Sequence, residues 1–280
     1  MTKQDIVNNE DNKMIALIDQ SGIEQAVGKL IEKNNSLLPN NVAVERIKNS
    51  AGFYIANRDD LMQLGKDGKL NMLYGILKEA MVGCEAGTDY DIIPFKGKPT
   101  IIRKKEGWFK IIDMIKPDEI VRFTSNVIIK GDDYSYNPVT EELTHKMNGT
   151  SDKYDDIEGA YCYIKFANGF EKTVFMSKKD IDSIKKVSPS ASSSFSPWTS
   201  MPMKMVKTKV VKEMAKELFT LFSARVNSTL AKAINSDEIA INRVDEKGNI
   251  VEDKTIYEAE IVEETPVVEE KEEQVNIEEL

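Results

Sequence analysis

Apolar residues recur every three or four positions in the first third of the chain, and this spacing predicts amphipathic helices. In the second helix, Val44, Ile47 and Ala51 share one face. Pro39 separates it from the first, since proline ends a helix. We interpret these stripes as faces that pack in the core. The predicted helices cover residues 23–33, 42–56 and 69–84.

The apolar pattern changes in the middle of the chain to one that predicts short antiparallel strands. Asn168-Gly169 lies between two of these runs and is a strong hairpin signal. Residues 108–115 fit a strand or a helix, and both alternatives stay open. The predicted strands are Tyr90–Phe95, Thr100–Arg103, Ile120–Ile129, Ala160–Phe166 and Phe170–Met176.

Helical spacing returns after the last strand. Ser177 and Asp180 form a capping box, which predicts a helix that continues to Val187. A loop with two prolines and six serines follows at 188–197, and helices are then predicted at 203–222 and 225–234. This order predicts an α+β fold, in which a small antiparallel β-sheet with hairpins is flanked by N-terminal and C-terminal helices.

Charge divides the chain into three expected parts. Residues 236–280 hold 16 acidic and 4 basic residues, a net charge of −12, so we expect an acidic disordered tail. The remaining 31 acidic and 34 basic residues give the rest of the chain a net charge of +3. We expect a flexible N-terminal arm at 1–20 and one core domain at 21–235. The body is therefore mildly basic, although the whole chain carries −9.

The bulk composition excludes several classes of protein. No apolar run is long enough for a membrane span, and Met1–Asn12 lacks the apolar segment of a signal peptide. Cys84 and Cys162 lie far apart and form no disulfide framework, as expected in a reducing cytoplasm.

Residues 172–216 form a cationic island. They hold ten lysines and three acidic residues, a net charge of +7, together with Phe195 and Trp198. Basic residues interleaved with aromatic ones are typical of a polyanion-binding surface, although ordinary solvated helix faces remain the alternative. A second basic run, Arg103, Lys104 and Lys105, lies at the end of the first hairpin. It forms either a second rim of a groove shared with the cationic island or a solvated turn. The candidate DNA-binding residues are Arg103, Lys104, Lys105, Lys178, Lys179, Lys185, Lys186, Trp198, Lys204, Lys207, Lys209 and Lys212.

The sequence lacks the residue types that most kinds of catalytic site require. The segment 96–100 resembles a phosphate-binding loop, but Ile92 stands where its first glycine should be. His145 is the only histidine, which removes most zinc sites and histidine-activated nucleophiles. We expect no cofactor, no metal and no enzymatic activity. Acidic pairs at 132–133 and 155–156 keep a metal-dependent nuclease as an alternative.

Three segments resemble the RecT family of phage recombinases. Two are the hairpins at 90–102 and 160–170, the first followed by Trp108 after a glycine. The most specific is Ser194-Phe-Ser-Pro-Trp-Thr followed by Met205-Val-Lys-Thr-Lys-Val, because the elements keep their order and spacing. The resemblance spans roughly residues 35–235.

The resemblance implies ATP-independent annealing of single-stranded DNA. It also implies binding of the annealed duplex, a homo-oligomeric ring or helical filament, and a phage exonuclease as partner in the cytoplasm of a bacterial host. Lys207 and Lys209 match the basic start of the family's long helix, and Trp198 matches its loop tryptophan. We expect the tail to contact a host protein such as the single-strand-binding protein. The alternatives are a phage nuclease and a scaffold protein with a solvated lysine-rich face.

Overall fold

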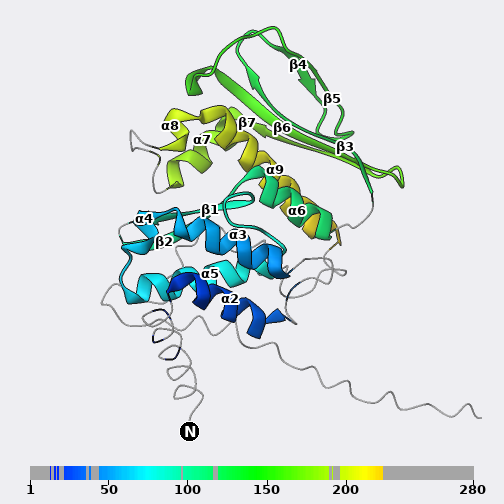
Figure 1. Cartoon of the computed structure of the whole chain (residues 1–280). Helices are drawn as coiled ribbons and strands as arrows, with labels where there is room; N and C mark the ends of the chain where they lie inside the picture. The colour runs from blue at the N-terminus through cyan, green and yellow to red at the C-terminus, as the bar shows by residue number, and fades with distance from the viewer. Residues whose placement is uncertain are drawn as a thin grey trace, which may run out of the picture. The chain divides into compact units, whose positions relative to one another are not determined.

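The computed structural model describes residues 13, 16, 18, 22–35, 38, 44–95, 97–115, 119–188, 191 and 196–222, and these residues form an α+β fold (Figure 1). The predicted fold class is thus confirmed. The predicted helix at 225–234 and the acidic tail lie outside the described residues. So does the predicted arm, apart from three positions. The domain boundaries therefore stay predictions.

Helices dominate the first part of the chain because their apolar stripes pack against one another. Ala26, Val27 and Ile31 of α2 are fully buried, and α2 packs against α3 and α5. All three predicted helices are confirmed, with ends shifted by a few residues, and the short α4 was not predicted. These helices are α2 (Ile23–Lys33), α3 (Val44–Ala56), α4 (Asp59–Met62) and α5 (Lys66–Ala80).

The first predicted hairpin is confirmed. Strands β1 (Tyr90–Phe95) and β2 (Lys98–Arg103) pair antiparallel, and Gly97 turns the chain with a φ of 76°. A positive φ is easily adopted by glycine and costly for most other residues, which explains why the turn uses one. The hairpin packs against α5 through β2.

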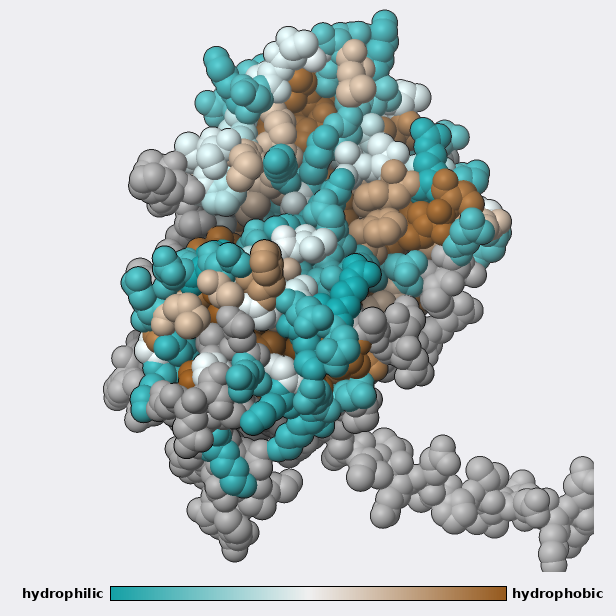
Figure 2. Space-filling view, in the orientation of Figure 1, coloured by the Kyte–Doolittle hydropathy of each residue, from teal (hydrophilic) through white to brown (hydrophobic). Residues whose placement is uncertain are grey.

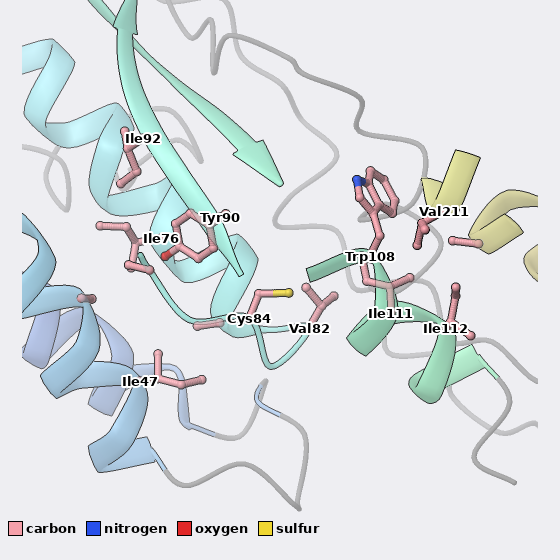
Figure 3. Close-up of a cluster of buried hydrophobic side chains, with 14 of the residues drawn as sticks. Ile47, Ile76, Val82, Cys84, Tyr90, Ile92, Trp108, Ile111, Ile112 and Val211 are labelled. Atoms are coloured by element: carbon pink, nitrogen blue, oxygen red, sulfur yellow. The ribbon is translucent and has the colours of Figure 1, made fainter. Parts of the chain in front are cut away.

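The segment that fitted strand or helix is the helix α6 (Lys105–Ile115). Its buried residues Trp108, Ile111 and Ile112 follow helical spacing and face α9, where Figure 3 shows Val211 beside Trp108. Gly107 allows the helix to approach the loop before β1, since an added Cβ would lie 2.5 Å from the carbonyl oxygen of Asp89.

The central sheet contains three antiparallel strands in the order β3 (Ile120–Ile129), β6 (Ile157–Phe166) and β7 (Glu171–Ser177). Alternation along β6 buries Cys162 and Ile164 and turns Tyr163 outward. All three predicted strands and the turn at Gly169, with a φ of 86°, are confirmed.

A second hairpin between β3 and β6 was not predicted. Its strands β4 (Asp133–Tyr136) and β5 (Leu143–Lys146) are short and polar, so their sequence lacks a clear apolar alternation. Tertiary contacts hold it instead. Among them, His145 Nε2 lies 3.0 Å from Asp132 Oδ2, and both side chains are buried.

Three helices follow β7: α7 (Lys178–Val187), α8 (Pro197–Ser200) and α9 (Pro202–Phe222). The capping box at Ser177 and Asp180 is confirmed. Helix α9 packs across all three strands of the central sheet and also against α6. None of the helices within the described ranges is long and apolar enough to cross a lipid bilayer.

A buried ion pair joins the helical part to β2. Arg103 donates two hydrogen bonds of 2.7 Å to the carboxylate of Glu79 on α5, and these side chains are 5% and 4% exposed. The guanidinium carbon also lies 5.0 Å from the ring centre of Trp108. Arg103 thereby links α5, β2 and α6.

Replacing Arg103 with alanine should destabilise the protein by about 3–5 kcal/mol, because it leaves the carboxylate of Glu79 buried without its charge partner. Urea unfolding followed by circular dichroism measures the effect. Lys104→Ala is the control, since Lys104 forms a more exposed pair with Asp91 at 3.0 Å and its loss should cost about 0–1 kcal/mol. Equal unfolding free energies for the two variants would contradict this assignment.

Candidate nucleic-acid interface

Packing sorts the lysines of α9 into two groups. Lys209 and Lys212 are each only 6% exposed, and the ammonium of Lys212 lies 5.8 Å from the ring centre of Trp108. Lys204 is exposed and Lys207 is partly exposed. The pair at 209 and 212 therefore packs inside the fold, because α9 is covered by both α6 and the sheet. Lys216, the fifth lysine of α9, is paired with Glu213, so Lys204 and Lys207 are the lysines of this helix placed to meet a ligand at the surface.

Lys207 lies close to Lys105, which comes from a distant part of the sequence. Partial burial lowers the pKa of Lys207, and the positive charge of Lys105 lowers it further. Within the described ranges, neither lysine forms an ion pair with a carboxylate. Lys105 is also the first residue of α6, where a positive charge opposes the helix dipole. Two unmatched cations at this position favour an anionic ligand.

An open pocket of about 460 Å³ adjoins the start of α9. Lys153 and Lys204 contribute positive charge, while Tyr154 and Met201 contribute a flat ring and an apolar side chain. Its lining also includes two carboxylates and two hydroxyls. The sequence analysis missed Lys153, because it is surrounded by acidic residues and its segment carries no net positive charge. The complete lining is Asp152, Lys153, Tyr154, Asp155, Thr199, Ser200, Met201, Pro202, Met203 and Lys204.

The lysines of α7 also fall into two groups. The ammonium groups of Lys178 and Lys185 lie 3.7 Å and 3.4 Å from the ring centre of Tyr154, whose hydroxyl donates to Asp182. Lys178 also pairs with that carboxylate at 2.9 Å. Both lysines therefore hold Tyr154 on the helix. Lys179 and Lys186 are exposed and form no ion pair with the described part of the chain.

Trp198 is not placed to stack on DNA bases. Its side chain is 1% exposed, because Ser196 caps α8 and turns the ring into the core. The indole Nε1 donates to Ser188 Oγ at 3.1 Å, and the ring meets Tyr154 edge to face. As a candidate DNA-binding residue, Trp198 is therefore not placed to contact a ligand in this structure, and it packs its loop onto the core.

The rim predicted after the first hairpin is reduced to one residue. Arg103 is buried against Glu79, and Lys104 donates to the carbonyl oxygen of Gly87 and pairs with Asp91. Lys105 forms no ion pair with the described residues, and its charge lowers the pKa of Lys207. The three neighbouring residues differ in environment because β2 ends at Arg103 and α6 begins at Lys105, so their side chains leave different elements.

One carboxylate of each acidic pair considered for metal chemistry is engaged in local structure. Asp132 accepts hydrogen bonds from the backbone N–H groups of Ile129, Asn148 and Gly149, and these bonds help to hold its pKa well below the usual range despite burial. Asp156 accepts from Ser151 and pairs with Lys130. Their geometry explains the turns in which they lie and favours a structural role.

The family model of the RecT family matches residues 92–256 of the sequence, more than half of its 280 residues. This chain belongs to the RecT family. The resemblance predicted from the sequence is thus confirmed, although the match begins later than residue 35 and continues into the predicted acidic tail. Members of the family anneal single strands in phage recombination and are not classical enzymes. No curated protein matched the sequence.

The unmatched lysines proposed above to face a ligand lie inside the matched region of this RecT-family chain. Lys105 begins α6, Lys204 and Lys207 lie on α9, and the exposed pair Lys179 and Lys186 lies on α7. The N-terminal helices α2 to α5 lie before the match.

Removing Lys105 should raise the pKa of Lys207, because it removes the repulsion between two positive charges. A lower pKa means a larger neutral fraction at a given pH, so acylation of Lys207 in the wild type should begin at lower pH than in Lys105→Ala. Mass spectrometry of the acylated peptide across pH 7–11 gives the midpoint. Lys165→Ala, which removes an equal charge elsewhere, should leave it unchanged. An unchanged midpoint in Lys105→Ala would show that the two amines do not interact.

Proposed function

We propose that this chain is an ATP-independent single-strand DNA annealing protein of phage homologous recombination. The observation that carries the proposal is the unmatched pair Lys105 and Lys207, which lies within the region that matches the RecT family. Cations without internal partners gain more from a phosphate than cations already paired with carboxylates, because no existing bond must be broken. Lys204, Lys179 and Lys186 extend the proposed surface.

The proposed mechanism is electrostatic. The lysines bind phosphates of one strand, and the released counterions make binding favourable and sensitive to salt. Lysine binds phosphate as a point charge and reads no base, so the bases stay available for pairing with a second strand. Base pairing then supplies the sequence specificity, and the same surface holds the annealed duplex. No cofactor is required by these steps.

Assembly follows from the weakness of each contact. A few lysines bind a strand weakly, but neighbouring copies on one strand bind with avidity. We therefore propose a homo-oligomer, either a ring or a helical filament. Within the same proposal, a phage exonuclease supplies the single strands in the cytoplasm of a bacterial host, and the acidic tail contacts the host single-strand-binding protein.

Annealing of two complementary oligonucleotides, one of them labelled, tests the function directly. The reaction contains EDTA and no ATP and is repeated across a salt series. We expect fast annealing that fades as salt rises. Annealing no faster than without protein, even at low salt, would exclude the proposal and leave a scaffold protein. Loss of DNA length when Mg²⁺ is added would instead indicate a nuclease.

The double variant Lys105→Ala/Lys207→Ala should bind single-stranded DNA about tenfold more weakly, and the slope of log K against log salt should fall by about 1.4, or about 0.7 for each lost phosphate contact. Fluorescence anisotropy across salt concentrations measures both quantities. Lys130→Ala/Lys165→Ala is the matched control, because it removes the same charge from lysines paired with Asp156 and Glu171. If both variants lose affinity equally, the effect comes from net charge alone.

A further inference from the structure

Strand β7 is an edge of the central sheet. Within the described ranges it pairs only with β6, as does β3 at the opposite edge. An open edge presents backbone N–H and C=O groups that can pair with a strand of another chain. Proteins close such edges or use them for association. The contacts of β7 therefore indicate how this edge is used.

A single side chain occupies part of the β7 edge. The carboxylate of Glu141, in the turn between β4 and β5, accepts a hydrogen bond of 3.2 Å from the backbone N–H of Thr173. The same carboxylate pairs with Lys172 Nζ, which also lies 3.8 Å from Glu217 of α9. Glu141 thus takes a backbone donor that an added strand would need.

Glu141 adopts a costly backbone conformation to reach this position. Its φ is 58°, and it has the only positive φ of any non-glycine residue among those described. A glutamate in the left-handed region costs about 1 kcal/mol or more and persists only where surrounding contacts compensate. The contacts of Glu141 with β7 compensate for this cost.

The rest of the hairpin docks on the same strand. The rings of Tyr134 and Tyr136 stack on Phe175 of β7, with ring centres 6.2 Å and 4.8 Å apart. The buried contact between Asp132 and His145 fixes the base of the hairpin. The base of the hairpin is therefore held by a buried contact and its strand by aromatic contacts. Its turn, where Glu141 has a positive φ, reaches the edge of the sheet.

We propose that Glu141 is a latch that closes the β7 edge, and that the strand admitted when it opens is β3 of a second copy of this chain. This inference rests on the self-assembly in the proposed function. Both β3 and β7 run antiparallel to β6, so they run in the same direction. A second copy can therefore add its β3 beside β7 and continue the sheet.

The start of β3 has the surface that such a contact needs. Val121 is 53% exposed, and the partly buried Phe123 packs edge to face on Phe109 of α6. Figure 2 shows a hydrophobic patch on the visible face where β3 and α6 lie in Figure 1. A contact between β3 of one copy and β7 of the next joins different surfaces, so it propagates into a ring or a helical filament.

The variant Glu141→Ala removes the carboxylate and should promote assembly without DNA. We expect half-assembly at about fivefold lower protein concentration, the effect of losing one net hydrogen bond. Mass photometry and sedimentation velocity measure it. Glu142→Ala is the matched control, because Glu142 is exposed and contacts only its own turn. Glu141→Gln retains an acceptor for the Thr173 N–H and should lie between the wild type and Glu141→Ala.

Hydrogen exchange locates the contact. In assembled Glu141→Ala, peptides that contain 120–126 and 171–177 should both gain protection, while β6 stays protected in every variant and shows that the fold is intact. Assembly equal to that of Glu142→Ala, or assembly that protects neither edge, would overturn the latch. Annealing by the wild type is measured separately. If the wild type anneals DNA but Glu141→Ala assembles no more readily than Glu142→Ala, the latch is wrong and the proposed annealing function is retained.

Discussion

The packing of α9 against two surfaces is the constraint on which the rest of the structure depends. One side of the helix covers the three strands of the central sheet, and another meets α6. Val206, Val210 and Met214 are consequently buried. A helix covered in this way has little surface left for solvent, so its five lysines cannot share one environment. This packing determines whether each lysine is buried or exposed. The candidate DNA surface includes the lysines that it leaves exposed.

Packing also determines which positive charges are neutralised inside the fold. Most described cations near the helical part are neutralised internally: Arg103 by Glu79, and Lys110 by Glu85 and Asp89. These pairs connect segments far apart in the sequence and leave nothing for a ligand. Against this background, Lys105 and Lys207 are two neighbouring lysines without a carboxylate partner among the described residues. Their repulsion is tolerated in the free protein and would be relieved by a bound phosphate, which is the physical basis of the proposed binding.

The two edges of the central sheet are the places where one copy of the chain can join another. A three-stranded sheet covered by a helix on one face still has two open edges, and each can start association. At one edge a strained glutamate occupies a backbone donor. At the other an apolar strand start lies exposed. Annealing requires that copies gather on DNA and not in free solution, so a closed edge that opens on assembly would suit the proposed function.

Local pattern by itself determined the three N-terminal helices α2, α3 and α5, the helices α7 and α9, the three strands of the central sheet, both predicted hairpins and the capping box, because periodicity and turn residues act over a few positions. It also located the cationic segment and the family. It did not reveal β4 and β5, whose polar strands depend on the stacking of Tyr134 and Tyr136 on Phe175 and on the contact between His145 and Asp132. Nor did it separate Lys207 from Lys209 and Lys212, or show that Trp198 is buried. Only the tertiary structure decided these, because the exposure of a side chain depends on which distant segments pack against it.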